Sequence, residues 1–374
     1  MDLKRIKNID VTLLVSVFLL LTFSLIILSS ASSNVGREPL DFVRKQATWM
    51  LIGITLAGSF LFVQYQTMAR FSWYIYAANL LLLMTVFFIG INVNGAVRWV
   101  NIGAFQFQPS EFSKLIMIVT FADFLARRQG QLNTLKELLP CFAYVAVPML
   151  LILKQPDLGT SLVLIAIMIG MMYAAGANKR ILTSLITGGL VVIVFSLYAH
   201  FQWGLPLPLQ EYQINRLIIF INPDLDPVRT GYHIRQSLIA IGSGGLFGKG
   251  LFNGTQAQLN FLPEHHTDFI FSVVGEELGF AGVFGLLLLF FILIVRGLRI
   301  ARDARDIYGS LLVIGILSMF LFHIMINVGM TIGIMPVTGI PLPFVSYGGS
   351  AMITNMACIG ILLNVNLRRR TILF

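Results

Sequence analysis

The stretch FLPEHHTDFIFSVVGEELG, from Phe261 to Gly279, gathers ionisable side chains in a chain that is otherwise strongly apolar. These side chains are Glu264, His265, His266, Asp268, Glu276 and Glu277. A long hydrophobic run begins directly after Asp268. Carboxylates and imidazoles at such a boundary can exchange protons with a substrate. We therefore take this segment as the first candidate for chemistry.

Asp268 stands where a helix is expected to begin, and two interpretations follow. In the first, Thr267 or Asp268 only caps that helix by accepting a backbone N–H. In the second, the carboxylate is a general base, and cations of the preceding segment hold an anionic leaving group. Those cations are Arg216, Arg229, Arg235 and Lys249. Spacing alone leaves both interpretations open.

Two further motifs place charges within expected membrane spans. QPSEFSK supplies Glu111 and Lys114, which share a helix face three residues apart and either pair with each other or line a polar cavity. KQPDLGT places Asp157 at the start of a span, where it either complements the helix dipole or faces the same cavity. Charged groups inside a membrane cost about 2.5–3.5 kcal/mol each and are functional candidates by default.

Other ionisable positions in apolar surroundings have a structural interpretation. We expect Glu276 or Glu277 to bond to a neighbouring helix, and His323 to do the same. Asp123 is expected to form a solvated ion pair with the nearby Arg127 or Arg128. None of these residues is assigned a catalytic role.

The elements that must position these residues are membrane helices. The chain has 374 residues, of which 57% are hydrophobic and 11% charged, and its mean hydropathy is +0.83. A soluble domain is about 25% charged. Because the apolar runs approach the roughly 20 residues that cross a bilayer, the composition predicts an all-α polytopic membrane protein.

We expect about ten transmembrane helices and one large extracytoplasmic loop between the seventh and the eighth. The expected spans are 11–31, 47–65, 71–91, 110–126, 138–153, 158–175, 181–200, 269–295, 308–335 and 347–367. The ninth contains Gly329 and Gly333, near which it is expected to bend or end. The loop, 201–268, is predicted to hold short amphipathic helices. No linker separates a second domain, so residues 1–374 are predicted to form a single membrane domain.

The basic residues predict the orientation of these spans. The formal net charge is +9, and most of the 26 Lys and Arg residues fall in the segments that share a side with the N-terminus. Because cytoplasmic loops collect Lys and Arg, both termini are expected in the cytoplasm and the 201–268 loop outside. This bias also explains the positive charge without nucleic acid, which we do not expect as a partner.

One segment resembles a nucleotide-binding motif without being one. GSGGLFGKG has Ser243 where a phosphate loop needs its first glycine, and Gly250 where it needs Ser or Thr after Lys249. Its glycines are expected to serve a turn or a close backbone approach. A metal site is not indicated either, since adjacent His265 and His266 would point about 100° apart on a helix.

At this point the chain resembles a known family. FLPEHHTDFIFSVVGEELG, GIPLPFVSYGGSAM, QPSEFSK, KQPDLGTS and the loop NPDLDPVRTGYHIRQSLIAIGSGGLFGKGLFNGTQ are similar to the shape, elongation, division and sporulation (SEDS) family, the RodA/FtsW type. The resemblance covers nearly the whole chain. The sequences GKGLFNGTQ and HHTDFIFSVVGEE are more similar to the RodA type than to the FtsW type, which implies a role in elongation and rod shape.

The resemblance implies a peptidoglycan glycosyltransferase of the bacterial cytoplasmic membrane. Such enzymes polymerise lipid II on the outer face, release polyprenyl pyrophosphate and work with a class B penicillin-binding protein, the transpeptidase. Besides lipid II and that partner, membrane lipids are expected contacts.

The resemblance also assigns residues. It implies that Asp268 is the essential carboxylate, and that Glu111, Lys114 and Asp157 match other family motifs. Ser346 falls in its S-Y-G-G-S segment. The substrate-facing set expected around Asp268 is Glu111, Lys114, Asp157, Arg216, Arg235, His265, His266 and Ser346. Lys114 and the loop arginines are expected to stabilise the diphosphate; no cofactor is certain, and a divalent cation, Mg²⁺ or Mn²⁺, is the open alternative.

Two other functions fit parts of the sequence. A lipid II flippase would also use buried charges such as Glu111 and Lys114, but it would need polar groups through the full depth of the membrane. The polar residues here favour the outer half and so favour the enzyme. A scaffold that only recruits the transpeptidase would leave the charges inside the membrane unexplained.

Overall fold

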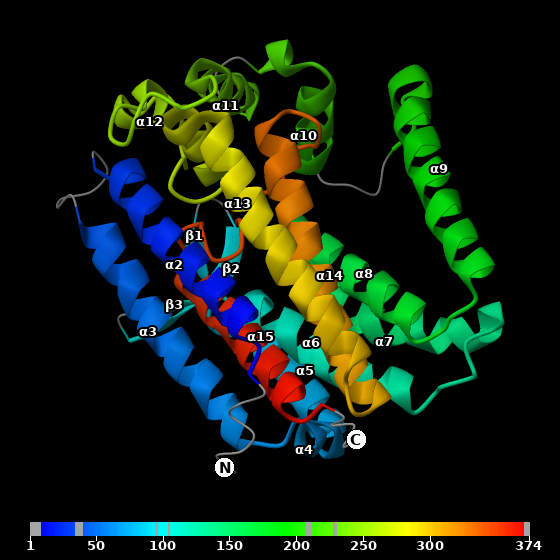
Figure 1. Ribbon diagram of the computed structural model, residues 1–374. Helices are drawn as coiled ribbons and strands as arrows, with labels where there is room; N and C mark the ends of the chain where they lie inside the picture. Colours follow the sequence, from blue (N-terminus) through cyan, green and yellow to red (C-terminus); the bar gives the residue numbers. More distant parts are fainter. Residues whose placement is uncertain are drawn as a thin grey trace.

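Ten long helices coincide with the ten expected spans in the computed structural model, which describes residues 9–33, 40–93, 96–103, 105–206, 211–226 and 230–369 (Figure 1). They are α2 (Val11–Ala31), α3 (Asp41–Phe62), α5 (Ser72–Ile89), α6 (Pro109–Ala126), α7 (Leu135–Lys154), α8 (Leu158–Ala174), α9 (Lys179–Trp203), α13 (Ile270–Arg302), α14 (Ile307–Thr331) and α15 (Gly349–Leu367). The prediction of an all-α polytopic membrane protein is confirmed.

Seven of these helices are long and apolar enough to cross a membrane by themselves, counting only the described residues. The other three are α3, α6 and α8. α8 has 17 residues, and α6 carries Glu111, Lys114 and Asp123. Because α6 buries its charges against neighbouring helices, it can lie inside the bundle without exposing them to lipid.

The long segment after α9 folds into short helices at one end of the bundle. They are α10 (Glu211–Ile221), the 3₁₀ helix η1 (Pro223–Leu225), α11 (Thr230–Gly244) and α12 (Thr255–Gln258). Figure 1 shows them gathered above the beginning of α13. Another short helix, α4 (Tyr65–Arg70), lies at the opposite end. The expected short helices are therefore present.

A small β-sheet, which the sequence did not predict, follows α5. Its strands are β1 (Ile91–Val93), β2 (Ala96–Ile102) and β3 (Phe105–Phe107), in antiparallel order β1-β2-β3. The register pairs Ile91 with Trp99 and Val100 with Phe107. The sheet brings Arg98, on β2, to the end of the bundle that also holds the start of α13.

The core is built around α15, which is almost wholly buried. It packs closely against α3, where a side chain at Gly360 would clash with the backbone of Ala57 and one at Gly53 would clash with Met356. Small residues at such crossings let helix backbones approach, which is how helices associate where lipid removes the hydrophobic driving force. This packing fixes the segment before α15, which is part of the site.

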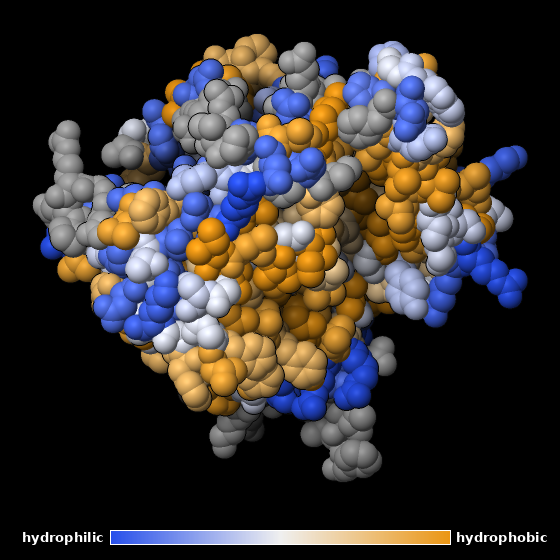
Figure 2. All heavy atoms as spheres, turned by 90° about the horizontal axis from the view of Figure 1, so that it is seen from above, coloured by the Kyte–Doolittle hydropathy of each residue, from blue (hydrophilic) through white to orange (hydrophobic). Residues whose placement is uncertain are grey.

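Helix α9 stands apart from the other helices (Figure 1). Its apolar side chains, such as Leu190, Val191 and Phe195, are more than half exposed. Seen from above, apolar side chains also line the hollow between it and the main body (Figure 2). A helix that is apolar and exposed all round is typical of a span that faces lipid.

The glycine-rich segment 242–250 is held against α13, as expected from its glycines. A Cβ atom at Gly248, whose φ is +78°, would lie 2.1 Å from the carbonyl oxygen of Glu277. The amides of Lys249 and Gly250 donate to the carbonyls of Glu276 and Glu277. These are the close backbone approaches that only glycine permits.

Several helix ends lie close to the expected boundaries, but α3 begins at Asp41, before the expected residue 47, and α13 continues to Arg302, beyond the expected residue 295. α14 ends at Thr331, close to Gly333, whose φ is +72°. α2 begins, and α13 and α15 end, at the end of the bundle opposite the short helices (Figure 1). The basic residues near the end of α13 and after α15 lie at that end; they are Arg296, Arg299, Arg302 and Arg368.

Candidate active site

Asp268 is not a helix cap in this structure, so one of its two interpretations is wrong. The N-cap position of α13 is Phe269, and no side chain caps the helix. The hydroxyl of Thr267 contacts the carbonyl and the carboxylate of Glu264 instead, at 3.2 and 3.0 Å. The Asp268 carboxylate forms no hydrogen bond with any described residue, and its side chain is only partly exposed. It is therefore available for chemistry.

The surroundings of Asp268 raise its pKa to about 6. Burial, which disfavours the charged form, is the largest cause, and the negative charge of Glu264 adds to it. The guanidinium groups of Arg216 and Arg98 act in the opposite direction and lower the pKa. A carboxylate with a pKa near 6 is mostly ionised at neutral pH, yet it is a stronger base than an ordinary aspartate.

The two arginines reach Asp268 from different elements. Arg98, on β2, donates to the carbonyl of Pro156 at 2.5 Å. Arg216, on α10, donates to the carbonyl of Thr338 at 3.3 Å. The segment after Thr338 also lies beside Asp268. A Cβ atom placed on Gly339 would be 3.3 Å from Oδ2 of Asp268. Arg216 and Asp268 thus meet at one backbone segment, and the charge of Arg98 acts on Asp268 as well.

Two buried polar atoms of the residues just described lack a hydrogen-bond partner among the described residues. They are Nε of Arg98 and the hydroxyl Oγ1 of Thr338. Buried donors are normally satisfied, and exceptions call for an explanation such as a missing ligand. A ligand with several acceptor oxygens would satisfy both donors.

The segment 338–348 is anchored around Asp268 by hydrogen bonds. Asn327 on α14 donates to the carbonyls of both Asp268 and Ile340, at 2.9 and 2.8 Å. The hydroxyl of Ser346 donates to the carbonyl of Thr267 at 2.7 Å and accepts from the amide of Leu342 at 2.8 Å. Ser346, expected near substrate, therefore holds two backbone segments together in this structure.

The two adjacent histidines also serve the backbone around Asp268. The buried ring of His265 contacts the carbonyls of Leu262 and Ala31 at 2.5 and 2.7 Å. The ring of His266 packs on Phe42 and Tyr347, with ring centroids 4.9 and 6.2 Å apart. Burial lowers the pKa of His266, so this ring is neutral at neutral pH. The structure places both next to Asp268 as supports, and a direct role toward substrate stays a prediction.

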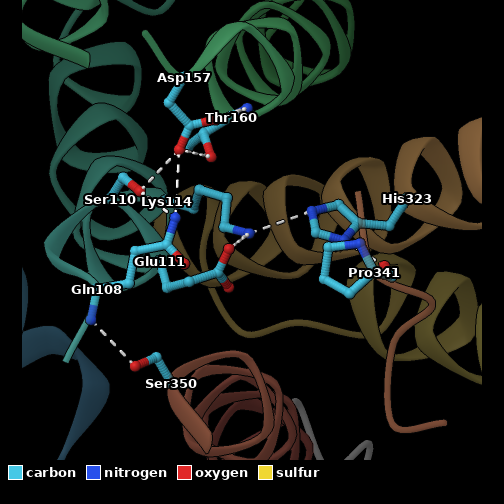
Figure 3. A network of polar contacts seen from close by, with 9 residues as sticks. All are labelled: Gln108, Ser110, Glu111, Lys114, Asp157, Thr160, His323, Pro341 and Ser350. Carbon is cyan, nitrogen blue, oxygen red and sulfur yellow. Dashed lines mark hydrogen bonds and ion pairs between the residues drawn. The ribbon is translucent and has the colours of Figure 1, made fainter. Parts of the chain in front are cut away.

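Glu111 and Lys114 form a buried ion pair, as their spacing predicts. Nζ of Lys114 lies 2.8 Å from Oε1 of Glu111 and 3.2 Å from Nε2 of His323 on α14 (Figure 3). Nδ1 of His323 faces the carbonyl of Pro341 at 3.3 Å. The Lys114 side chain is 2% exposed. Because His323 lies one helical turn from Asn327, this chain of contacts supports the segment that surrounds Asp268.

Asp157 is the N-cap of α8, which confirms its structural interpretation. Its carboxylate accepts from the amide and the hydroxyl of Thr160, at 3.1 and 2.9 Å. It also accepts from Ser110 at 3.1 Å and Gln108 at 3.3 Å, so it ties α8 to α6 (Figure 3). The structure leaves a separate role toward substrate as a prediction.

Other loop cations are engaged elsewhere. The exposed Arg235 forms an ion pair with Asp224. Lys249 pairs with the buried Glu276 at 2.6 Å. Arg229 lies outside the described residues. Among the described residues, the cations that lower the pKa of Asp268 are therefore Arg216, which was expected from the sequence, and Arg98, which was not.

The remaining structural interpretations are confirmed, except that Asp123 is buried rather than solvated. Glu277 accepts from Ser30 on α2 at 2.6 Å. Asp123 pairs with Arg127 at 3.0 Å and also bonds Ser72. The contacts of Ser30 with Glu277 and of Ser72 with Asp123, like that between His323 and Lys114, join neighbouring helices inside the bundle, whereas the Asp123–Arg127 pair lies at the end of α6.

The described residues include no group of three or more His, Cys, Asp or Glu side chains that could hold a metal ion. The carboxylate whose charge raises the pKa of Asp268 is that of Glu264. Two carboxylates beside two guanidinium groups do not form a metal site of protein ligands alone.

Three residues of the site were not expected from the sequence: Arg98, Thr338 and Asn327. Arg98 precedes Trp99 in a short strand that had not been predicted, so nothing suggested its proximity to Asp268. Thr338 and Asn327 are ordinary polar residues near apolar runs. Only Thr338 had a signal in the sequence: it directly precedes the GIPLPFVSYGG motif and could have been assigned to the site with it.

Known proteins match this chain over nearly its whole length. The sequence model of the family described as "Cell cycle protein", the FtsW/RodA/SpoVE family, matches residues 11–371. The peptidoglycan glycosyltransferase RodA of Treponema pallidum is 35% identical over 99% of this chain and 100% of its own length. Stage V sporulation protein E of Bacillus subtilis is 40% identical, over 96% of this chain and 96% of its own length.

Solved structures show the same fold. One belongs to a peptidoglycan synthase complex that coordinates polymerisation and crosslinking; its TM-score is 0.81 and its identity 29%, covering 96% of this chain and 97% of that one. The rod shape determining protein RodA of Thermus thermophilus has a TM-score of 0.70 and 28% identity, covering 97% of this chain and 98% of its own.

Proposed function

Since this chain belongs to the FtsW/RodA/SpoVE family of cell cycle proteins, we propose that it polymerises lipid II into glycan strands with Asp268 as the general base. Its relatives are named peptidoglycan glycosyltransferases, and this is the enzymatic activity of the chain. The observation that supports the role of Asp268 is a carboxylate without a hydrogen bond to any described residue, with a raised pKa, in the field of two guanidinium groups.

The proposed reaction is a single displacement. The Asp268 carboxylate takes the proton of the acceptor's sugar hydroxyl, and that oxygen bonds to the anomeric carbon of the donor. The bond between this carbon and the diphosphate oxygen breaks, and polyprenyl diphosphate leaves with the electron pair, which inverts the configuration. A diphosphate is a weak base and needs no acid to leave, so one carboxylate is sufficient.

Arg98 and Arg216 are the proposed ligands of the departing diphosphate. Guanidinium groups bind phosphate oxygens through paired N–H donors. Nε of Arg98 and Oγ1 of Thr338 are the orphaned donors such a ligand would satisfy. Lys114 remains a candidate for the same task, although it is bound to Glu111 and His323 here. A Mg²⁺ or Mn²⁺ ion stays an alternative that would have to arrive with the diphosphate, because the described side chains do not form a site for it.

The cellular role is proposed from the relatives. The chain is a multi-pass membrane protein. We propose that both termini are cytoplasmic, that Asp268 faces the outside of the bacterial cell membrane, and that the chain serves elongation and rod shape. A related structure is part of a complex that couples polymerisation to crosslinking. This supports a class B penicillin-binding protein as the partner.

The flippase alternative has no specific observation in its favour. The relatives are named glycosyltransferases, and the Glu111–Lys114 pair is closed by His323 rather than open along a path. Residues 1–374, with the 201–268 loop, are proposed to act as one membrane domain.

Polymerisation should depend on pH through Asp268. The base works in its ionised form, so the rate constant kcat/KM should rise with pH through about 6 and then level off. At pH 5 only about a tenth of the carboxylate would be ionised. The measurement is the pH profile of glycan synthesis from labelled lipid II by the purified protein with its transpeptidase. A profile that stays flat from pH 5 to 8 would exclude a base of this pKa.

The variant Glu264→Gln provides a sharper form of this experiment. Removing the negative charge of Glu264 lowers the pKa of Asp268, because that charge raises it now. The rising limb should therefore move to lower pH while the plateau rate changes little. If the limb does not move, it reports another ionisation.

Removing either guanidinium should weaken diphosphate stabilisation. We expect Arg98→Gln and Arg216→Gln to lower kcat/KM by about 10- to 100-fold each, since a charge-assisted hydrogen bond contributes about 1.5–3 kcal/mol. Each loss also removes a cation that lowers the pKa of Asp268, so the pH limb should move upward. A variant that lost activity without this shift would have lost only structure.

A further inference from the structure

A charged hollow lies at the end of the bundle opposite Asp268. Its volume is about 380 Å³. The residues that line it are Asp10, Arg296, Arg299, Ile300, Arg302, Asp303, Asn366 and Arg369. They come from the start of α2, the last turns of α13 and the segment after α15, which are far apart in the sequence but meet here.

The hollow holds more positive charge than its own carboxylates neutralise. Arg296 is paired with the buried Asp10, with Nε 2.8 Å from Oδ2. Arg302 is paired with Asp303 at 3.2 Å. The side chains of Arg299 and Arg369 have no hydrogen-bond or ion-pair partner among the described residues. Two guanidinium groups therefore line the same hollow with their donors free.

The carboxylate of Asp10 does not neutralise this excess, because it is already used. It caps α2 by accepting from the amide of Leu13 at 3.0 Å, and both its oxygens contact Nε of Arg296. Asp10 is 8% exposed. It fixes Arg296 as part of the wall of the hollow, so the site does not depend on mobile surface side chains alone.

The hollow lies at the depth of lipid headgroups. α13 is interrupted at Gly279, whose φ and ψ are not helical, and the helix that follows runs on to Arg302. This second part corresponds to about 35 Å of helix. The hydrocarbon core of a bilayer is about 30 Å thick. Because Asp268 lies just before one end of α13 and Arg299 near the other, the hollow falls just beyond the hydrocarbon. Phosphate groups of lipids are the most concentrated anions at that depth.

We propose that this hollow binds the phosphate of an anionic phospholipid, with Arg299 and Arg369 as its ligands. Arginine forks match phosphate oxygens, and basic pockets between membrane helices at this face bind acidic headgroups. The alternative, that these residues only mark the cytoplasmic side by their charge, does not require their donors to line one hollow. The proposal is independent of Asp268 and of the polymerase reaction.

The test measures binding of fluorescent phosphatidylglycerol to the purified full-length protein in a neutral detergent. Each arginine near the surface is worth about a fivefold change in affinity for acidic lipid, so the variant Arg299→Gln/Arg369→Gln should bind about 30-fold more weakly. The matched control is Lys179→Gln/Arg180→Gln, which removes two charges from the start of α9, at the same face. The control should bind as the wild type does.

Three results would overturn the proposal. Equal losses in both double variants would show attraction by net charge alone. Equal binding of phosphatidylcholine would show that the lipid's negative charge is not recognised. Displacement of the probe by millimolar inorganic phosphate would identify a site for a soluble anion. Because Arg299 is exposed and unpaired, the single variant Arg299→Gln should fold normally and lose about fivefold in affinity, which serves if the double variant does not fold.

Discussion

Asparagine in place of Asp268 is expected to lower lipid II polymerisation at neutral pH by a factor of about 10² to 10⁴, the usual contribution of a general base. The amide has the size and shape of the carboxylate but cannot accept the proton of a sugar hydroxyl. Asp268 does not cap α13, so the exchange removes no helix cap. A loss of activity would therefore report the lost base. The measurement is the yield of labelled glycan chains from purified protein with its class B penicillin-binding partner.

Stability provides an independent test of the same assignment. The pKa of Asp268 is raised in the folded protein to about 6, above the value of about 3.9 for an unfolded chain. The ionised carboxylate therefore costs stability above pH 6, and this cost disappears as the pH falls from 6 to below 4. At neutral pH Asp268→Asn should melt at the same or a higher temperature than the wild type. An inactive protein of undiminished stability is the expected combination.

The control for this experiment is Asp41→Asn. Asp41 begins α3 and forms an exposed ion pair with Lys45 at 2.7 Å, so its loss should change activity less than twofold. If Asp268→Asn kept full activity, the base would lie elsewhere, and Glu264 would be the next candidate. If neither the wild type nor the variant polymerised lipid II in a folded complex with the partner, the flippase alternative would regain support.

The membrane helices were predictable because each is specified by its own residues. An apolar run near 20 residues long must satisfy its backbone hydrogen bonds within itself, so it forms a helix wherever it lies. The three-stranded sheet was not predictable in this way. β1 and β3 have three residues each, which is too short for a recognisable alternation, and the strands are stabilised by pairing with β2.

The identity of the base was predictable, but the set of residues around it was only partly so. Asp268 stands in a dense local motif, which made it visible in the sequence. Its cations are long-range neighbours: Arg98 arrives on the unpredicted sheet, while Lys249, much closer in sequence, is held by Glu276. His265 and Ser346 were expected to face substrate, but they bond to the backbone carbonyls of Ala31 and Thr267. A hydrogen bond to a backbone carbonyl leaves no pattern in the sequence, so these contacts were not predictable.

The second large effect is expected on stability, from breaking the buried Glu111–Lys114 pair. Lys114→Met would leave the Glu111 carboxylate, 7% exposed, without its cation. An unpaired buried charge costs about 3–5 kcal/mol, so the free energy of unfolding should fall by about that amount. The measurement is reversible unfolding by denaturing detergent in mixed micelles. The reverse variant, Glu111→Met, should lose a similar amount because Lys114 would then be the uncompensated charge.

Replacing both partners separates a supporting pair from a catalytic one. A buried ion pair exchanged for two apolar residues of similar size is often neutral in stability, so Glu111→Met/Lys114→Met should recover most of the loss, apart from the contact between Lys114 and His323. We expect polymerase activity to recover with stability, because Lys114 is directed at protein groups and supports the segment around Asp268 through His323. A double variant that is stable yet inactive would contradict this and would place Lys114 on the diphosphate.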